Sequence, residues 1–150
     1  MTLTRRMDRN GLITTEVSGT VSTAAYLDGV LELGELTAYA SDLWEIVIIH
    51  PETLVLDDKR ASLELAHSAK ETLQFKSRGA IALYCSTHRL RPWSEDIASL
   101  LRGDAVPVIS FNDESDARKW LDISRKSARQ TATTRVSVSL PGALGPSNRL

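Results

Sequence analysis

Two kinds of hydrophobicity pattern predict an α/β fold. Apolar runs typical of buried strands occur at 46–49 and 80–85, and a period-two alternation marks an earlier strand at 11–22. Each of these segments is followed by a stretch with apolar residues at helical spacing. Strands that alternate with helices of this length pair in parallel, with the helices packed against the sheet. We therefore expect a single α/β domain of element order βαβαβαβα, with a mostly parallel or mixed sheet.

The first strand is followed by an expected helix at 23–43. Ser22 or Thr23 can serve as its N-cap, because both side chains can accept a hydrogen bond from the first turn. We expect this helix to bend or break near Gly34, since glycine costs a helix interior about 1 kcal/mol relative to alanine.

The centre of the sheet is expected at 44–49, where the unbroken apolar run indicates a strand covered on both faces. Residues 61–77 place apolar side chains on one helical face, and 80–85 form another apolar strand. An amphipathic helix then lies between Pro92 and Gly103, in the positions that these two residues favour at helix ends.

The last strand is expected at the sheet edge. Residues 106–111 contain Pro107, which lacks a backbone donor and is tolerated only on an edge strand or at a strand's first residue. Asn112 and Asp113 then cap a final helix that ends near Ser124.

The chain divides into an N-terminal extension at 1–10, the α/β domain at 11–124 and a basic tail at 125–150. The tail is rich in Ser, Thr, Gly and Pro, and cannot bury enough apolar area to fold alone. Valines alternate with serines at 135–140, so a strand added to this sheet or lent to a neighbouring subunit is an open alternative there.

Composition excludes several classes of function. The 150 residues are 42% hydrophobic and 25% charged, which is ordinary for one soluble domain. No run reaches the roughly 18 to 20 apolar residues of a membrane span, and no signal-peptide pattern is present, so we expect a cytoplasmic protein. The net charge of −1 combines basic ends with an acidic middle, and only 5% of residues are aromatic. Nucleic-acid binding is therefore disfavoured.

No motif predicts catalysis, a metal site or a cofactor. The sequence has no glycine-rich phosphate loop, and its histidines lack metal-binding spacings. An enzyme that uses Cys85 or His50 is an alternative, because both residues end predicted strands and His88 lies near the cysteine. Neither has an orienting third group. We therefore expect a protein without enzymatic activity.

The segment at 48–61, IIHPETLVLDDKRA, resembles the signature region of STAS domains, the family of bacterial anti-sigma factor antagonists. In that region a strand leads through an apolar patch into D-S-S-G at the start of a helix. Asp58 falls on the aspartate of that motif, while Lys59, Arg60 and Ala61 fall on serine, serine and glycine.

The whole span 8–122, including SGTVST and VISFNDESDARKWL, is similar to the SpoIIAA-like branch of that family. The resemblance implies a non-enzymatic, regulatory domain that docks a protein partner through this loop and helix. In the antagonists, serine phosphorylation abolishes docking, but Arg60 replaces that serine here and Ser62 is the nearest substitute. We expect Asp58, Lys59, Arg60 and Ser62 to face a protein partner, and we expect a homo-oligomer.

Two other binding modes stay open. Trp44, Trp93 and Trp120 could frame a cavity between sheet and helices, in which a small apolar ligand or a lipid would bind. Basic residues near helix ends could instead bind an anion, although scattered surface cations would give the same pattern. These basic residues are Lys59, Arg60, Arg89, Arg91 and Arg102.

Overall fold

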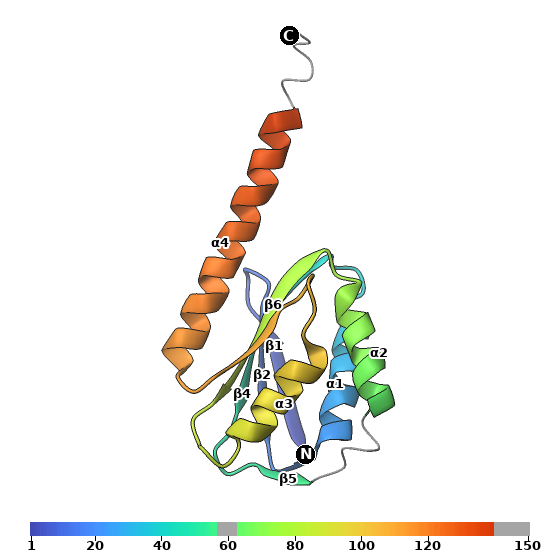
Figure 1. The fold of residues 1–150 in the computed structure, drawn as a ribbon, viewed down its shortest axis with the longest axis vertical. Coiled ribbons are helices and arrows are strands. Elements are labelled where there is room, and N and C mark those ends of the chain that lie inside the picture. Colours follow the sequence, from blue (N-terminus) through green and yellow to red (C-terminus); the bar gives the residue numbers. More distant parts are fainter. Residues whose placement is uncertain (57–62, 140–150) are drawn as a thin grey trace.

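The computed structural model describes residues 1–56 and 63–139 (Figure 1). A five-stranded mixed sheet of order β1-β2-β4-β6-β7 is covered by helices, and a two-stranded sheet, β3-β5, lies beside it. The strands are β1 (Thr2–Met7), β2 (Leu12–Ser18), β3 (Thr20–Ser22), β4 (Asp42–Ile49), β5 (Leu54–Leu56), β6 (Arg78–Cys85) and β7 (Val108–Phe111). The helices are α1 (Thr23–Leu36), α2 (Leu63–Gln74), α3 (Arg91–Leu101) and α4 (Glu114–Ser139). The predicted α/β class is confirmed.

Strands β2, β4, β6 and β7 pair in parallel in chain order, and β4 lies at the centre of the main sheet. The predicted position of the central strand is therefore confirmed. The edge position of β7 is confirmed as well, and Pro107 directly precedes this strand, so its missing N–H removes no donor within it.

Residues 1–10, expected as an extension, instead contribute a strand to the sheet. β1 pairs antiparallel with β2, from Thr2 opposite Ser18 to Met7 opposite Ile13. The turn between the two strands is closed by Asp8, whose carboxylate accepts hydrogen bonds from the backbone N–H groups of Asn10 and Leu12, at 2.8 and 2.9 Å.

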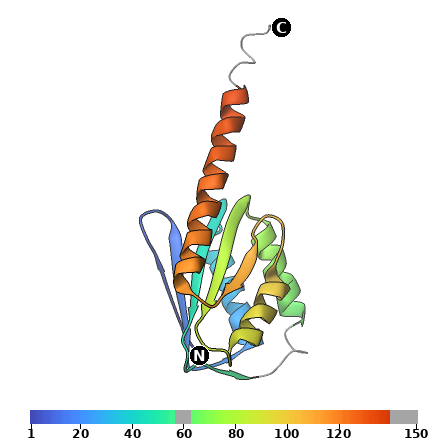
Figure 2. The ribbon, with the colours of Figure 1, turned by 60° about the vertical axis from the view of Figure 1, so that its left-hand side comes forward.

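The two faces of the sheet carry separate apolar cores. Helices α1, α2 and α3 cover one face and α4 covers the other (Figures 1 and 2). Successive side chains of a strand point to opposite faces. Leu43 and Val47 of β4 therefore belong to the larger core, while Trp44 and Ile46 belong to the core under α4.

Helix α1 begins as expected and ends earlier. The side chain of Ser22 accepts a hydrogen bond from the N–H of Ala25 at 3.0 Å, which confirms an N-cap at this position. The expectation that the helix extends to residue 43 is wrong, because α1 ends at Leu36 and Leu43 already lies in β4. Gly34 sits in the last turn, so the break expected near it corresponds to the end of the helix at Leu36.

Helix α4 is longer than the sequence predicts. Asp113 caps its start by accepting a hydrogen bond from the N–H of Asp116 at 3.0 Å. The helix continues through Ser139 and extends past the edge of the sheet (Figure 1), so residues 135–139 do not form the strand that the sequence left as an alternative at 135–140. Residues 114–139 contain neither glycine nor proline. Once the first turns are packed, nothing in the sequence stops helix propagation there.

Within the described part of the chain, no helix combines the length and the apolar character needed to cross a bilayer.

A close approach between β4 and β6 predicts a strong effect of one substitution. A Cβ atom added at Gly79 of β6 would lie 2.0 Å from the carbonyl oxygen of Leu43 in β4. We expect Gly79→Ala to lower the free energy of unfolding by about 3 kcal/mol, because the central strand pair must separate locally. Urea denaturation followed by circular dichroism measures this change.

Gly29→Ala is the matched control, since its Cβ would meet only the ends of the flexible Leu3 and Arg5 side chains, at 3.0 and 3.3 Å. The gain in helix propensity should offset this contact and keep the change within about 1 kcal/mol. Equal destabilisation by both substitutions would contradict the assignment of the effect to the β4–β6 approach.

Candidate functional site

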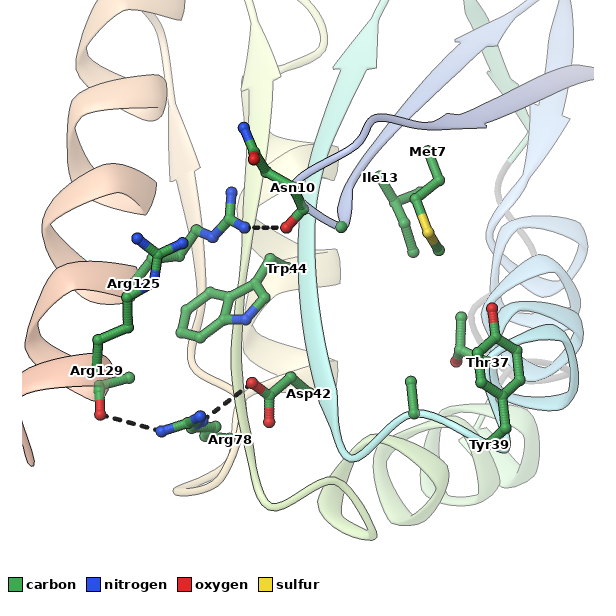
Figure 3. Close-up of a pocket in the computed structure, with 13 residues that line it drawn as sticks. Met7, Asn10, Ile13, Thr37, Tyr39, Asp42, Trp44, Arg78, Arg125 and Arg129 are labelled. Carbon is green, nitrogen blue, oxygen red and sulfur yellow. Dashed lines mark hydrogen bonds and ion pairs between the residues drawn. The ribbon is translucent and has the colours of Figure 1, made fainter. Parts of the chain in front are cut away.

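A pocket of about 290 Å³ lies at the amino-terminal edge of the parallel strands, between α4 and the β1–β2 turn (Figure 3). We call it the amino-edge pocket. The starts of β4 and β6 and the loop after α1 complete its wall. The polar and aromatic lining residues on which its chemistry depends are Asn10, Tyr39, Asp42, Trp44, Arg78, Arg125 and Arg129.

Arg78 joins the sheet to α4 at the rim of the pocket. It stands opposite Asp42 in the register of β4 and β6, and its Nε donates to a carboxylate oxygen of Asp42 at 3.0 Å. Its Nη1 donates to the carbonyl of Ala128 in α4, also at 3.0 Å. The carboxylate of Asp42, the only one among the described lining residues, is thus already paired with an arginine of the wall.

Arg125 crosses the pocket from α4 toward the β1–β2 turn (Figure 3). Its guanidinium lies 5.9 Å from the centroid of the Trp44 ring, within cation–π range, and donates a hydrogen bond to the carbonyl of Asn10. Arg129 lies one helical turn further along α4 and also lines the pocket. Among the described residues, the lining therefore holds three guanidinium groups and one carboxylate, an excess of positive charge.

A second cluster of polar side chains lies near the carboxyl-terminal edge of the sheet. His50 Nε2 lies 3.0 Å from a carboxylate oxygen of Glu16, and the other oxygen of that carboxylate lies 3.5 Å from Arg6. The thiol of Cys85, at the end of β6, is buried and donates to the carbonyl of Thr87 at 3.3 Å. His50 thus has a local partner, and Cys85 is shielded from solvent.

The three tryptophans do not frame one cavity. Trp93 lies in the larger core, edge-on to Tyr26 with a centroid distance of 5.7 Å, and its indole N–H donates to Thr23 Oγ1 at 3.0 Å. Trp44 and Trp120 lie on the opposite face, in the core under α4.

Two of the predicted anion-binding cations, Arg89 and Arg102, lie at different places, whereas Lys59 and Arg60 fall outside the described residues. Arg89 precedes α3 and donates to the carbonyls of Pro51 and Thr53, at 2.9 and 2.7 Å. Arg102 lies at the other end of α3, where its Nε donates to the carbonyl of Val108 at 3.4 Å. Helix α3 therefore separates the two guanidinium groups.

The predicted partner-facing residues Asp58, Lys59, Arg60 and Ser62 lie outside the described residues. The described residues on either side of them are notable for exposed apolar side chains. Leu54, Leu56 and Leu63 are 58%, 57% and 63% exposed. We call these three residues the leucine surface.

No protein-family model matches the chain, and no curated protein matches it in sequence. The STAS resemblance therefore stays a prediction from the sequence. Among the residues that the structure describes, no group of three or more His, Cys, Asp or Glu side chains could hold a metal ion.

Sequence reasoning missed the amino-edge pocket. The available signal was the spacing of Arg125 and Arg129, which places both on one helix face. This spacing indicates a pocket only when it is known that α4 packs across the sheet and that Asp42 lies opposite Arg78.

A buried carboxyl group lies on the α1 side of the sheet. Glu45 in β4 is 2% exposed and accepts a hydrogen bond from Thr15 Oγ1 at 2.5 Å. Burial raises the pKa of Glu45, and the Thr15 hydrogen bond and the charge of Arg5 oppose that shift. Burial also raises the pKa of Tyr26, and the Glu45 carboxylate adds to this effect.

The raised pKa of Glu45 predicts a pH-dependent stability. The folded state holds the Glu45 proton more tightly than the unfolded chain does. In the unfolded chain the pKa of this carboxyl group has its ordinary value of 4.5. This contribution to stability is complete below that value and is lost as pH rises through the folded pKa. Glu45→Gln cannot ionise, so its unfolding free energy relative to wild type should increase from acidic to neutral pH. Urea unfolding across this range measures the difference.

Glu35→Gln is the matched control, because it removes a carboxylate from an exposed position of α1. The difference in unfolding free energy between Glu35→Gln and wild type should not increase from acidic to neutral pH as it does for Glu45→Gln. A Glu45→Gln variant whose stability parallels wild type at every pH would contradict the buried-carboxyl interpretation.

Proposed function

We propose that the chain is a non-enzymatic, regulatory domain that binds a protein partner through the leucine surface. The observation that carries this proposal is the exposure of Leu54, Leu56 and Leu63, each more than half accessible to solvent. Fully burying one leucine contributes about 1.5 to 3 kcal/mol of free energy. A partner that covers this surface would therefore gain a considerable binding free energy.

The way β5 is held explains why its leucines point outward. Val55 packs against the larger core and pairs with Val21 of β3. Because neighbouring side chains of a strand alternate, Leu54 and Leu56 share the opposite face. The fold thus anchors β5 through one apolar residue and presents two others to solvent.

The resemblance to STAS domains supports the same location. It assigns partner docking to Asp58, Lys59, Arg60 and Ser62, and the leucine surface lies directly before and after them in the chain. Since arginine stands where the antagonists carry the phosphorylated serine, the proposal includes no phosphate switch at that position. The partner we propose is a different protein with a complementary apolar patch.

Site-specific photo-crosslinking tests this proposal. A photoreactive amino acid at Leu56, introduced into the full chain in its native cell, should capture one discrete protein, which mass spectrometry identifies. The purified partner should then bind wild type with a measurable Kd, and Leu56→Glu should weaken binding about 30-fold, as loss of a central apolar contact does.

Tyr39 provides the matched control, since it is 82% exposed but lies in the loop between α1 and β4, away from β5. Tyr39→Glu should leave the Kd unchanged. Crosslinks only to a second copy of the chain, no discrete product from Leu56, or equal weakening by both variants would each reject the proposed heterologous docking.

A further inference from the structure

We propose that the amino-edge pocket binds a small organic anion, a phosphate or carboxylate carried on a planar group, because three arginines line it together with the indole ring of Trp44. This site is separate from the leucine surface. The pocket lies where β4 and β6 begin, whereas β5 lies at the opposite end of the sheet (Figures 1 and 3).

The charge of the pocket favours an anion. Arg78 is paired with Asp42, but Arg125 donates only to a neutral backbone carbonyl, and Arg129 makes no ion pair within the described part of the chain. Like charges four residues apart on a helix destabilise it by about 0.2 to 0.5 kcal/mol. A bound anion would turn this repulsion into attraction and would use donors that the fold leaves available.

The donor geometry favours a phosphate or a carboxylate. A guanidinium presents paired N–H groups that match the oxygens of either anion, often two at a time. Arg125 and Arg129 belong to successive turns of α4, so their guanidinium groups can reach one anion from the same side. Arg78 approaches from the sheet, which would place the anion between sheet and helix.

The size and the aromatic lining limit the rest of the ligand. Ligand pockets commonly measure about 300 to 1,000 Å³, so 290 Å³ suits a small metabolite and not a dinucleotide. Trp44 and Tyr39 both line the pocket, and neither ring belongs to the larger core. Aromatic rings favour planar partners, which supports a flat body on the anion.

Isothermal titration calorimetry with three test ligands examines the proposal. Phenyl phosphate has both an anionic group and a planar ring. Inorganic phosphate has only the anionic group, and benzyl alcohol has only the ring. We expect phenyl phosphate to saturate one site on the full chain, with weaker binding of inorganic phosphate and none of benzyl alcohol. Added salt should weaken binding, because charge–charge attraction is screened. In NMR spectra the indole N–H signal of Trp44 should shift, and those of Trp93 and Trp120 should not.

Arg129→Gln is the decisive variant, since Arg129 is exposed and its removal should leave folding intact. It should raise the Kd for phenyl phosphate about tenfold or more, whereas Arg129→Lys should recover part of the affinity. Lys126→Gln removes the same charge from α4 at a residue that pairs with Asp122 at 3.5 Å and does not line the pocket. It should leave the Kd within about twofold of wild type.

Three outcomes would overturn the proposal. Absence of saturable binding would reject the site. Equal weakening by Arg129→Gln and Lys126→Gln would show diffuse attraction to a basic helix instead of a pocket. Inorganic phosphate binding as tightly as phenyl phosphate would reject the planar group. None of these results depends on the leucine surface, so they leave the proposed protein docking untouched.

Discussion

The central strand β4 has to be covered on both faces, and most of the molecule follows from that requirement. Its side chains are apolar on either side of the backbone, apart from Glu45 and the first residue, Asp42. Helices α1 to α3 cover only one face, so α4 must return across the other. There the alanines of β6, Ala80 and Ala82, leave room for a helix to approach closely.

The path of α4 also brings two of its basic residues to the amino ends of the strands. The helix starts after β7 and runs back toward the amino ends of the strands. Arg125 and Arg129 therefore arrive beside Asp42 and Arg78, although these segments lie far apart in the sequence. A helix needed for the core thus also supplies most of the charge at the amino-edge pocket.

Buried polar groups hold the wall of that pocket in place. Lys76 is nearly buried, and its ammonium group donates to the carbonyls of Thr37 and Ala40, at 2.5 and 2.9 Å. Both carbonyls belong to the loop between α1 and β4, which lines the pocket. Since the buried ammonium group donates to two carbonyls of one loop, it holds that loop in place despite the loop's lack of regular structure.

The sequence alone determined the elements whose causes are local. Apolar runs located β4 and β6, Pro107 marked the edge strand, and Ser22 and Asp113 gave helix starts that the hydrogen bonds confirm. Only the tertiary structure decided the rest. β1 has weak alternation because Arg5 occupies an inward position, where α1 supplies Glu32 at 3.2 Å and the carbonyl of Gly29. The amino-edge pocket needs contacts between segments distant in the chain, and hydrophobic periodicity reports only on neighbours within a few turns.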